Sequence, residues 1–132
     1  MNSPLVQRMQ PFGTSIFAEM TQRALAADAV NLGQGAPDSG TPPELVEWAH
    51  EAMVAGRNQY PPFWGVPELR EAIAAHQQRF HRLEVDPSEV LVTVGATEAI
   101  AGAIIGLVEP GERVVLIEPY YDAYAAATAM AG

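Results

Sequence analysis

The sequence predicts an α/β fold, and the second half of the chain carries that prediction. Residues 90–94 and 113–117 are short apolar runs rich in β-branched side chains, a composition typical of buried parallel strands. Residues 96–108 between them follow an apolar helical pattern. This order predicts one right-handed βαβ unit. Because two strands do not make a stable open sheet, we expect the unit to belong to a larger sheet.

Three helices are predicted before the first of these strands. Thr14 and Ser15 are both suitable N-caps for a helix over residues 15–27. Thr41-Pro42-Pro43-Glu44 has the pattern of a capping box with proline in the first turn, and Gly56 is a plausible stop for the helix that follows. Pro67 opens a third helix, which we expect to end near Leu83.

Loops and turns separate these elements. The loop over residues 33–40 is rich in glycine, and the loop over residues 57–65 is dense in aromatic residues and prolines. Residues 86–88 and 109–112 have the Asp, Pro, Gly and Ser content of turns. A last helix is expected to begin near Tyr121 or Asp122, after the second strand.

Composition and charge argue against several classes of protein. Sixteen acidic residues against seven basic ones give a formal net charge of −9, which disfavours binding to nucleic acids and to anionic membranes. Without cysteine there is no disulfide and no thiolate site, and the three histidines lack a metal-binding spacing. We see neither a membrane-spanning run nor a signal peptide, so the expected location is the cytoplasm.

The turn after the first strand is the first candidate for an anion site. The opening amides of the helix have no intrahelical partner, and the helix dipole adds positive charge. Gly95 lets a ligand approach the backbone, and the hydroxyl of Thr97 adds a donor. An ordinary strand-to-helix turn is the alternative, and Glu98 opposes a dianion unless its side chain turns away. Neither the dinucleotide fingerprint nor the P-loop pattern matches.

Three further segments are candidates for binding, each with a plain turn or local packing as the alternative. The amides around Gly33 and Gly35 could lie against a small carboxylate. The aromatic cluster of residues 60–64 suits a pocket wall or an interface anchor. The segment of residues 118–122 follows the carboxyl end of the second strand, and the ring of Tyr120 or Tyr121 there could stack on a flat cofactor.

Taken together, these segments resemble the class I/II aminotransferases of fold type I, which use pyridoxal 5'-phosphate. The resemblance runs from about residue 12 to the end, and the branch with kynurenine/glutamine transaminases and N-succinyldiaminopimelate aminotransferases is the most similar. The motifs are S-I-F-x-E-M at 15–20, N-L-G-Q-G-A-P-D at 31–38, N-Q-Y-P-P-F-W-G-V-P-E-L-R-E-A-I-A at 58–74, V-T-V-G-A-T-E-A at 92–99 and E-P-Y-Y-D-A-Y at 118–124.

The resemblance implies roles for individual positions. The backbone of Gly35 would lie against the substrate carboxylate. The turn of Gly95, Ala96 and Thr97 would hold the cofactor phosphate, and Tyr121 would stack on the pyridine ring. Tyr60 would reach the phosphate in a partner subunit, so a homodimer is implied. The implied substrates are an amino acid and a 2-oxo acid.

The chemistry of this family needs a lysine that forms a Schiff base with the cofactor. All seven basic residues are arginine, and the chain contains no lysine. We therefore expect a truncated fold type I chain without a catalytic residue, inactive and poorly folded alone. Residues 1–30 would be an N-terminal arm and helix. Residues 31–132 would be an incomplete class I/II domain, with small-domain segments and the first βαβ unit of the large-domain sheet.

Two other functions stay open at this point. A carbon–sulfur lyase of the same fold would share these segments, because the motifs before residue 132 do not separate elimination from transamination. A non-catalytic α/β module that binds a nucleotide or a protein partner is the second alternative. It would be a stable monomer with a complete sheet.

Overall fold

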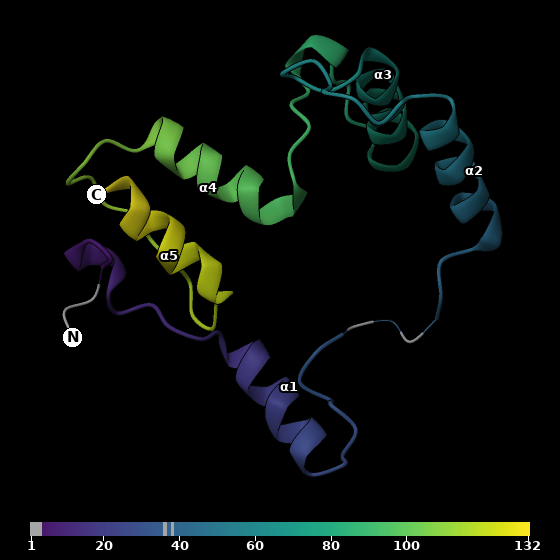
Figure 1. The fold of residues 1–132 in the computed structure, drawn as a ribbon. Coiled ribbons are helices and arrows are strands. Elements are labelled where there is room, and N and C mark those ends of the chain that lie inside the picture. The colour runs from purple at the N-terminus through teal and green to yellow at the C-terminus, as the bar shows by residue number, and fades with distance from the viewer. Residues whose placement is uncertain (1–3, 36, 38) are drawn as a thin grey trace. The chain divides into compact units, whose positions relative to one another are not determined.

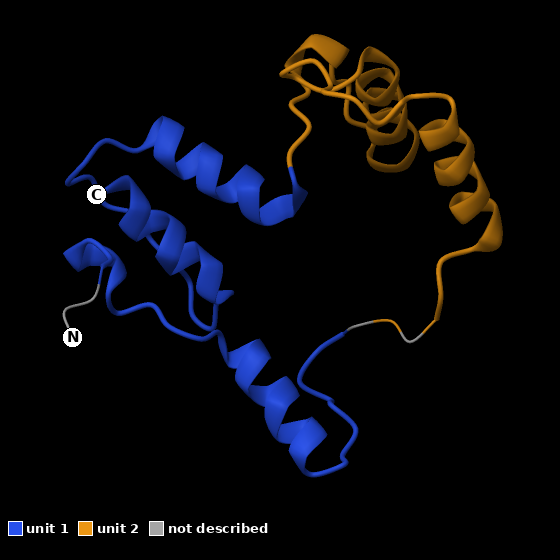
Figure 2. Ribbon diagram, viewed as in Figure 1, with its two compact units in different colours: residues 1–36, 94–132 blue, residues 37–93 orange. Residues whose placement is uncertain are grey.

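The structure is a computed structural model that describes residues 4–35, 37 and 39–132. Ala36 and Asp38 of the glycine-rich loop therefore lie outside the described residues. The chain forms two compact units, which Figure 2 shows in separate colours. The first unit contains residues 1–36 and 94–132, and the second contains residues 37–93. Each unit is described by itself.

Helices make up the regular structure of the described residues (Figure 1). The predicted helices are confirmed, with small differences at their ends. The third predicted helix continues beyond its α-helical part as a π-helical turn, which ends at Arg82 in the left-handed conformation with φ of 56°. The elements are η1 (Gln7–Met9), α1 (Ile16–Ala26), α2 (Pro43–Val54), α3 (Pro67–His76), η2 (Gln77–His81), η3 (Pro87–Glu89), α4 (Gly95–Leu107) and α5 (Asp122–Ala131).

The helix starts show which local predictions were sound. The hydroxyl of Ser15 accepts a hydrogen bond from the amide of Ala18 at 3.3 Å, so the predicted cap of α1 is confirmed. The predicted capping box of α2 is wrong, because the N-cap is Pro42 and no side chain caps the helix. Two consecutive prolines, Pro42 and Pro43, already restrict φ and lack amide donors, so less remains for a cap to satisfy.

A capping box forms instead at η3, where only a turn was predicted. The carboxylate of Asp86 accepts from the amide of Ser88 at 2.7 Å, and the amide of Asp86 donates to Glu89 at 3.1 Å. The hydrogen bonds from Ser88 lower the pKa of Asp86. The ionised carboxylate of Asp86 therefore stabilises the turn, and this stabilisation is lost as the pH falls through the lowered pKa of Asp86.

The two predicted strands are wrong for this structure, because the described residues contain no strand. None of the apolar side chains of the two segments is buried, and Val94 and Val115 are 89% and 86% exposed. A parallel strand becomes buried only when neighbouring strands take its backbone hydrogen bonds and helices cover its faces. The apolar pattern therefore reports the environment that these segments need, which the described residues do not supply.

In the first unit, α4 packs against α5, and α5 packs against η1. Figure 1 shows α4 and α5 side by side and running in the same direction. Ala127 on α5 is 4% exposed, and the small alanine side chains of α5 allow a close approach between helices. The amino ends of α4 and α5 consequently lie at the same end of the pair.

In the second unit, the segment after η3 is fastened to α3 and to the aromatic loop. The guanidinium Nε of Arg70 donates to the carbonyl of Val90 at 2.9 Å, and the amide of Val92 donates to the carbonyl of Trp64 at 3.1 Å. Gly65 is buried with φ of +101°, and an added Cβ would lie 2.5 Å from Cγ2 of Val92. Both the backbone conformation and the available space therefore require glycine there.

Most apolar side chains of the chain remain accessible. Ala74 and Ala127 are the buried apolar residues among those described. The accessible surface is 11326 Å², whereas a folded monomer of this mass would expose about 6,700 Å². Apolar surface on this scale is typical of a chain that needs further protein to cover it. In the part of the chain that the structure describes, no helix is both long and apolar enough to cross a bilayer.

Replacing Gly65 by alanine should loosen the second unit. The new Cβ would collide with Val92 and strain the positive φ, so we expect a loss of about 1–3 kcal/mol in the opening free energy of the Val92 amide. Amide hydrogen exchange at Val92 measures this change. Gly40→Ala is the matched control, because an added Cβ there meets nothing within 4 Å. Equal exchange in the two variants would contradict the account.

Candidate functional site

The start of α4 carries the residues predicted to hold an anion. Gly95 opens the helix with φ of +77°, and an added Cβ there would meet no heavy atom within 4 Å. The amides of Ala96 and Thr97 lie in the first helical turn, where no carbonyl of the helix can reach them. All three residues are exposed. The turn therefore offers amide donors and the hydroxyl of Thr97 at the positive end of a 13-residue helix.

Glu98, the residue that argued against an anion site, is held by the backbone just before the helix. Its carboxylate accepts a hydrogen bond from the amide of Val94. The side chain thus satisfies the amide that precedes the turn, and leaves the amides of Ala96 and Thr97 to another acceptor. Its charge still offsets part of the helix dipole, so the amide and hydroxyl donors are the main attraction that this turn offers to an anion.

Tyr121 stands at the corresponding point of α5, where it is the N-cap residue. Its ring is 41% exposed. The ring of Phe17 lies 5.6 Å from it, centroid to centroid, and the ring of Tyr124 lies 5.7 Å away in an edge-on arrangement. Because α4 and α5 run in the same direction, Tyr121 lies at the same end of the helix pair as the turn at Gly95.

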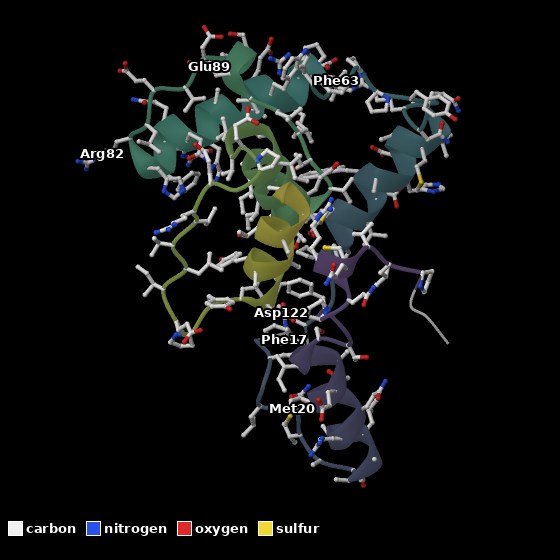
Figure 3. All side chains as sticks on the ribbon, turned by 90° about the vertical axis from the view of Figure 1, so that its left-hand side faces the viewer. Phe17, Met20, Phe63, Arg82, Glu89 and Asp122 are labelled. Carbon is white, nitrogen blue, oxygen red and sulfur yellow. The ribbon has the colours of Figure 1, made fainter. Side chains whose placement is uncertain are left out.

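The glycine-rich loop reaches the same end through α1. The side-chain amide Nε2 of Gln34 donates to the carbonyl of Phe17 at 3.1 Å, so the residue before Gly35 is bound to the helical turn whose ring contacts Tyr121. Figure 3 shows Phe17 close to Asp122, the first residue of α5. Gly35 itself is exposed, and an added Cβ would meet nothing within 4 Å.

An open groove of about 360 Å³ lies beside this end of the first unit. One wall is the segment of residues 11–16, which leads into α1, and the other is formed by Asp122, Ala123 and Ala126 of α5. The first unit therefore contains three of the predicted regions, namely the α4 turn, Tyr121 and the beginning of the glycine-rich loop. The N-terminal segment beside the groove was not predicted as part of a site.

Tyr60 belongs to the second unit, and its side chain is fully exposed at 100%. It lies in the aromatic loop before α3, where the rings of Phe63 and Trp64 meet edge to face at 5.3 Å. The prolines at positions 61 and 62 restrict the backbone beside it. A rigid loop with an exposed tyrosine suits contact with a partner molecule.

Sequence reasoning missed the part that α1 plays in this site. Phe17 and Gln34 were predicted only as members of the family-like motifs at 15–20 and 31–38, without a role of their own. The spacing of Phe17 and Thr21, one helical turn apart, was visible in the sequence. The sequence does not show that Phe17 and Thr21 accept hydrogen bonds from side chains of a loop 10–17 residues away. Such contacts depend on how the chain turns back after α1.

The chain is similar to known aminotransferases. The chain matches the family Aminotransferase class I and II over residues 27–132. It is 55% identical over 128 residues to a probable N-succinyldiaminopimelate aminotransferase of Mycobacterium tuberculosis, covering 96% of this chain and 32% of that protein. It is 42% identical over 134 residues to the methionine aminotransferase of Escherichia coli (99% and 35%) and 36% identical over 129 residues to the kynurenine–oxoglutarate transaminase 3 of mouse (96% and 28%).

The solved structures give the same result for the fold. The N-succinyldiaminopimelate aminotransferase of Mycobacterium tuberculosis superposes with a TM-score of 0.90 at 54% identity, over 97% of this chain and 34% of that one. The chain thus spans about a third of the length of these relatives, and its fold is that of a portion of an aminotransferase. The resemblance seen in the motifs is confirmed: the chain belongs to the aminotransferase class I and II family.

Proposed function

We propose that this chain is part of an enzyme that uses pyridoxal 5'-phosphate to transfer an amino group between an amino acid and a 2-oxo acid. The observation that carries the proposal is the turn of Gly95, Ala96 and Thr97, which lies inside the matched family region and opens a 13-residue helix. The amides of Ala96 and Thr97 have no carbonyl partner within that helix. We assign residues 1–30 to an arm and residues 31–132 to the class I/II domain.

The residues at this end of the first unit fit the cofactor. A phosphate dianion is recognised by convergent N–H and O–H donors at a helix N-terminus, and Ala96 and Thr97 offer them. The missing side chain of Gly95 leaves room for the oxygens. The half-exposed ring of Tyr121, braced by Phe17, offers a flat face for an aromatic ring. When bound, the cofactor supplies the electron sink for the carbanion chemistry of amino-group transfer.

The remaining assignments concern the substrate and the partner subunit. The exposed backbone of Gly35 would lie against the carboxylate of the amino acid, because no side chain blocks its approach. Tyr60 would reach the cofactor phosphate of a second copy of the protein, which makes the active enzyme a homodimer. The full exposure of Tyr60 beside two further aromatic residues supports this role.

The 132 residues alone should not carry out the reaction. In this family a lysine binds the cofactor and moves the proton between substrate and cofactor carbons, and the chain contains no lysine. Its exposed apolar surface also lacks the cover that the rest of an aminotransferase would provide.

A chimera tests the proposed function. This chain would replace the matching N-terminal third of the Mycobacterium tuberculosis relative, to which it is 55% identical. We expect the chimera to transaminate at least one of N-succinyldiaminopimelate, methionine and kynurenine, the compounds in the names of the relatives, while the 132-residue chain alone does not. A chimera that folds and binds the cofactor but releases no 2-oxo acid from any amino donor would contradict the proposal.

Thr97→Val in the same chimera tests the phosphate site. Loss of one charge-assisted hydrogen bond to phosphate should raise the dissociation constant for pyridoxal 5'-phosphate roughly tenfold or more. Equilibrium dialysis measures that constant. Thr41→Val is the matched control, because Thr41 is also an exposed threonine before a helix and α2 has no side-chain cap. The same constant in both variants would remove Thr97 from the site.

A further inference from the structure

The hydroxyl of Thr21 is the centre of a polar network that joins α1 to the glycine-rich loop. It donates to the carbonyl of Phe17 at 2.8 Å and accepts from the side-chain amides of Asn31 and Gln34, each at 3.2 Å. A hydroxyl has one donor and two acceptor positions. All three are therefore in use, and each of these contacts is partly buried.

The network holds the beginning of the loop, through Asn31 and Gln34. Asn31 also accepts from the amide of Gly33 at 2.9 Å, which closes a tight turn of the kind that Asn side chains favour. Gln34 makes a second hydrogen bond, to the carbonyl of Phe17 at 3.1 Å. The backbone that continues into Gly35 is consequently fixed to one turn of α1 by two side chains.

The same turn of α1 also contacts Tyr121, through the ring of Phe17. The ring of Phe17 lies 5.6 Å from the ring of Tyr121 at an interplanar angle of 52°, an arrangement that contributes about 0.5–1.5 kcal/mol beyond area burial. One helical turn, residues 17–21, thus receives the substrate loop through its polar groups and the aromatic residue of α5 through its ring.

We propose that Thr21 and Gln34 are positioning residues that set the place of the Gly35 backbone relative to the ring of Tyr121. This inference rests on the proposed function, because it takes Gly35 as the contact for the substrate carboxylate. Neither side chain needs to touch the substrate. They act by holding the loop in the conformation that binds it, so they affect substrate affinity rather than the chemical step.

Thr21→Val in the chimera tests this role. Valine keeps the shape of threonine but removes all three hydrogen bonds, so the KM for the amino acid should rise roughly tenfold with a much smaller change in kcat, the pattern of lost uniform binding. The amides of residues 33–35 should exchange with solvent faster. Thr21→Ser retains the hydroxyl and should restore both values. Gln22→Ala, at the exposed neighbouring position, is the matched control and should change neither.

Gln34→Met is the second variant, since it keeps the length of the side chain and removes its donors. It should reproduce the KM effect of Thr21→Val. An unchanged KM in both variants would overturn the proposal, as would equal loss of kcat and kcat/KM. If the unsubstituted chimera shows no transamination, the proposed function has failed, and amide exchange then decides the network by itself. Exchange at residues 33–35 that is the same in Thr21→Val and Thr21→Ser would overturn it.

Discussion

The amides of Ala96 and Thr97 have no hydrogen-bond partner within α4, and the rest of the site follows from that constraint. A helix N-terminus leaves its opening N–H groups to water, a side chain or a ligand. Here the carboxylate of Glu98 accepts from the amide of Val94, which precedes the helix. Gly95 has no side chain that would block access to the amides of Ala96 and Thr97. The parallel course of α4 and α5 then places Tyr121 at the same end, and Phe17 links that ring to the loop before Gly35.

Interactions between residues close in sequence were sufficient to predict the helices but not the strands. The cap of α1 by Ser15 and the start of α3 at Pro67 depend only on neighbouring residues, and both were predicted correctly. The segments around Val92 and Val115 would form strands only beside neighbouring strands, which the described residues do not supply. Their apolar pattern therefore predicted a buried environment that is not present among the described residues. The contacts of Thr21 with Asn31 and Gln34 join residues 10 and 13 positions apart, beyond the reach of any periodic pattern.

The exposed surface and the family comparison are consistent with each other. The chain spans about a third of its relatives, and most of its large apolar side chains remain accessible. The helices form because their caps, prolines and short-range packing suffice. The described residues form no sheet, because parallel strands are stabilised only by the strands and helices around them. The turn of Gly95, Ala96 and Thr97 depends on one helix end and is consequently present without the sheet.

The most direct test of this account compares pyridoxal 5'-phosphate with pyridoxal, which lacks the phosphate, by amide resonances of the chimera. The account predicts that the phosphate form shifts the Ala96 and Thr97 amides downfield, as expected for new hydrogen bonds to an anion, and that pyridoxal does not. Equal shifts with both compounds, or none with either while the cofactor is bound, would show that the start of α4 does not hold the phosphate.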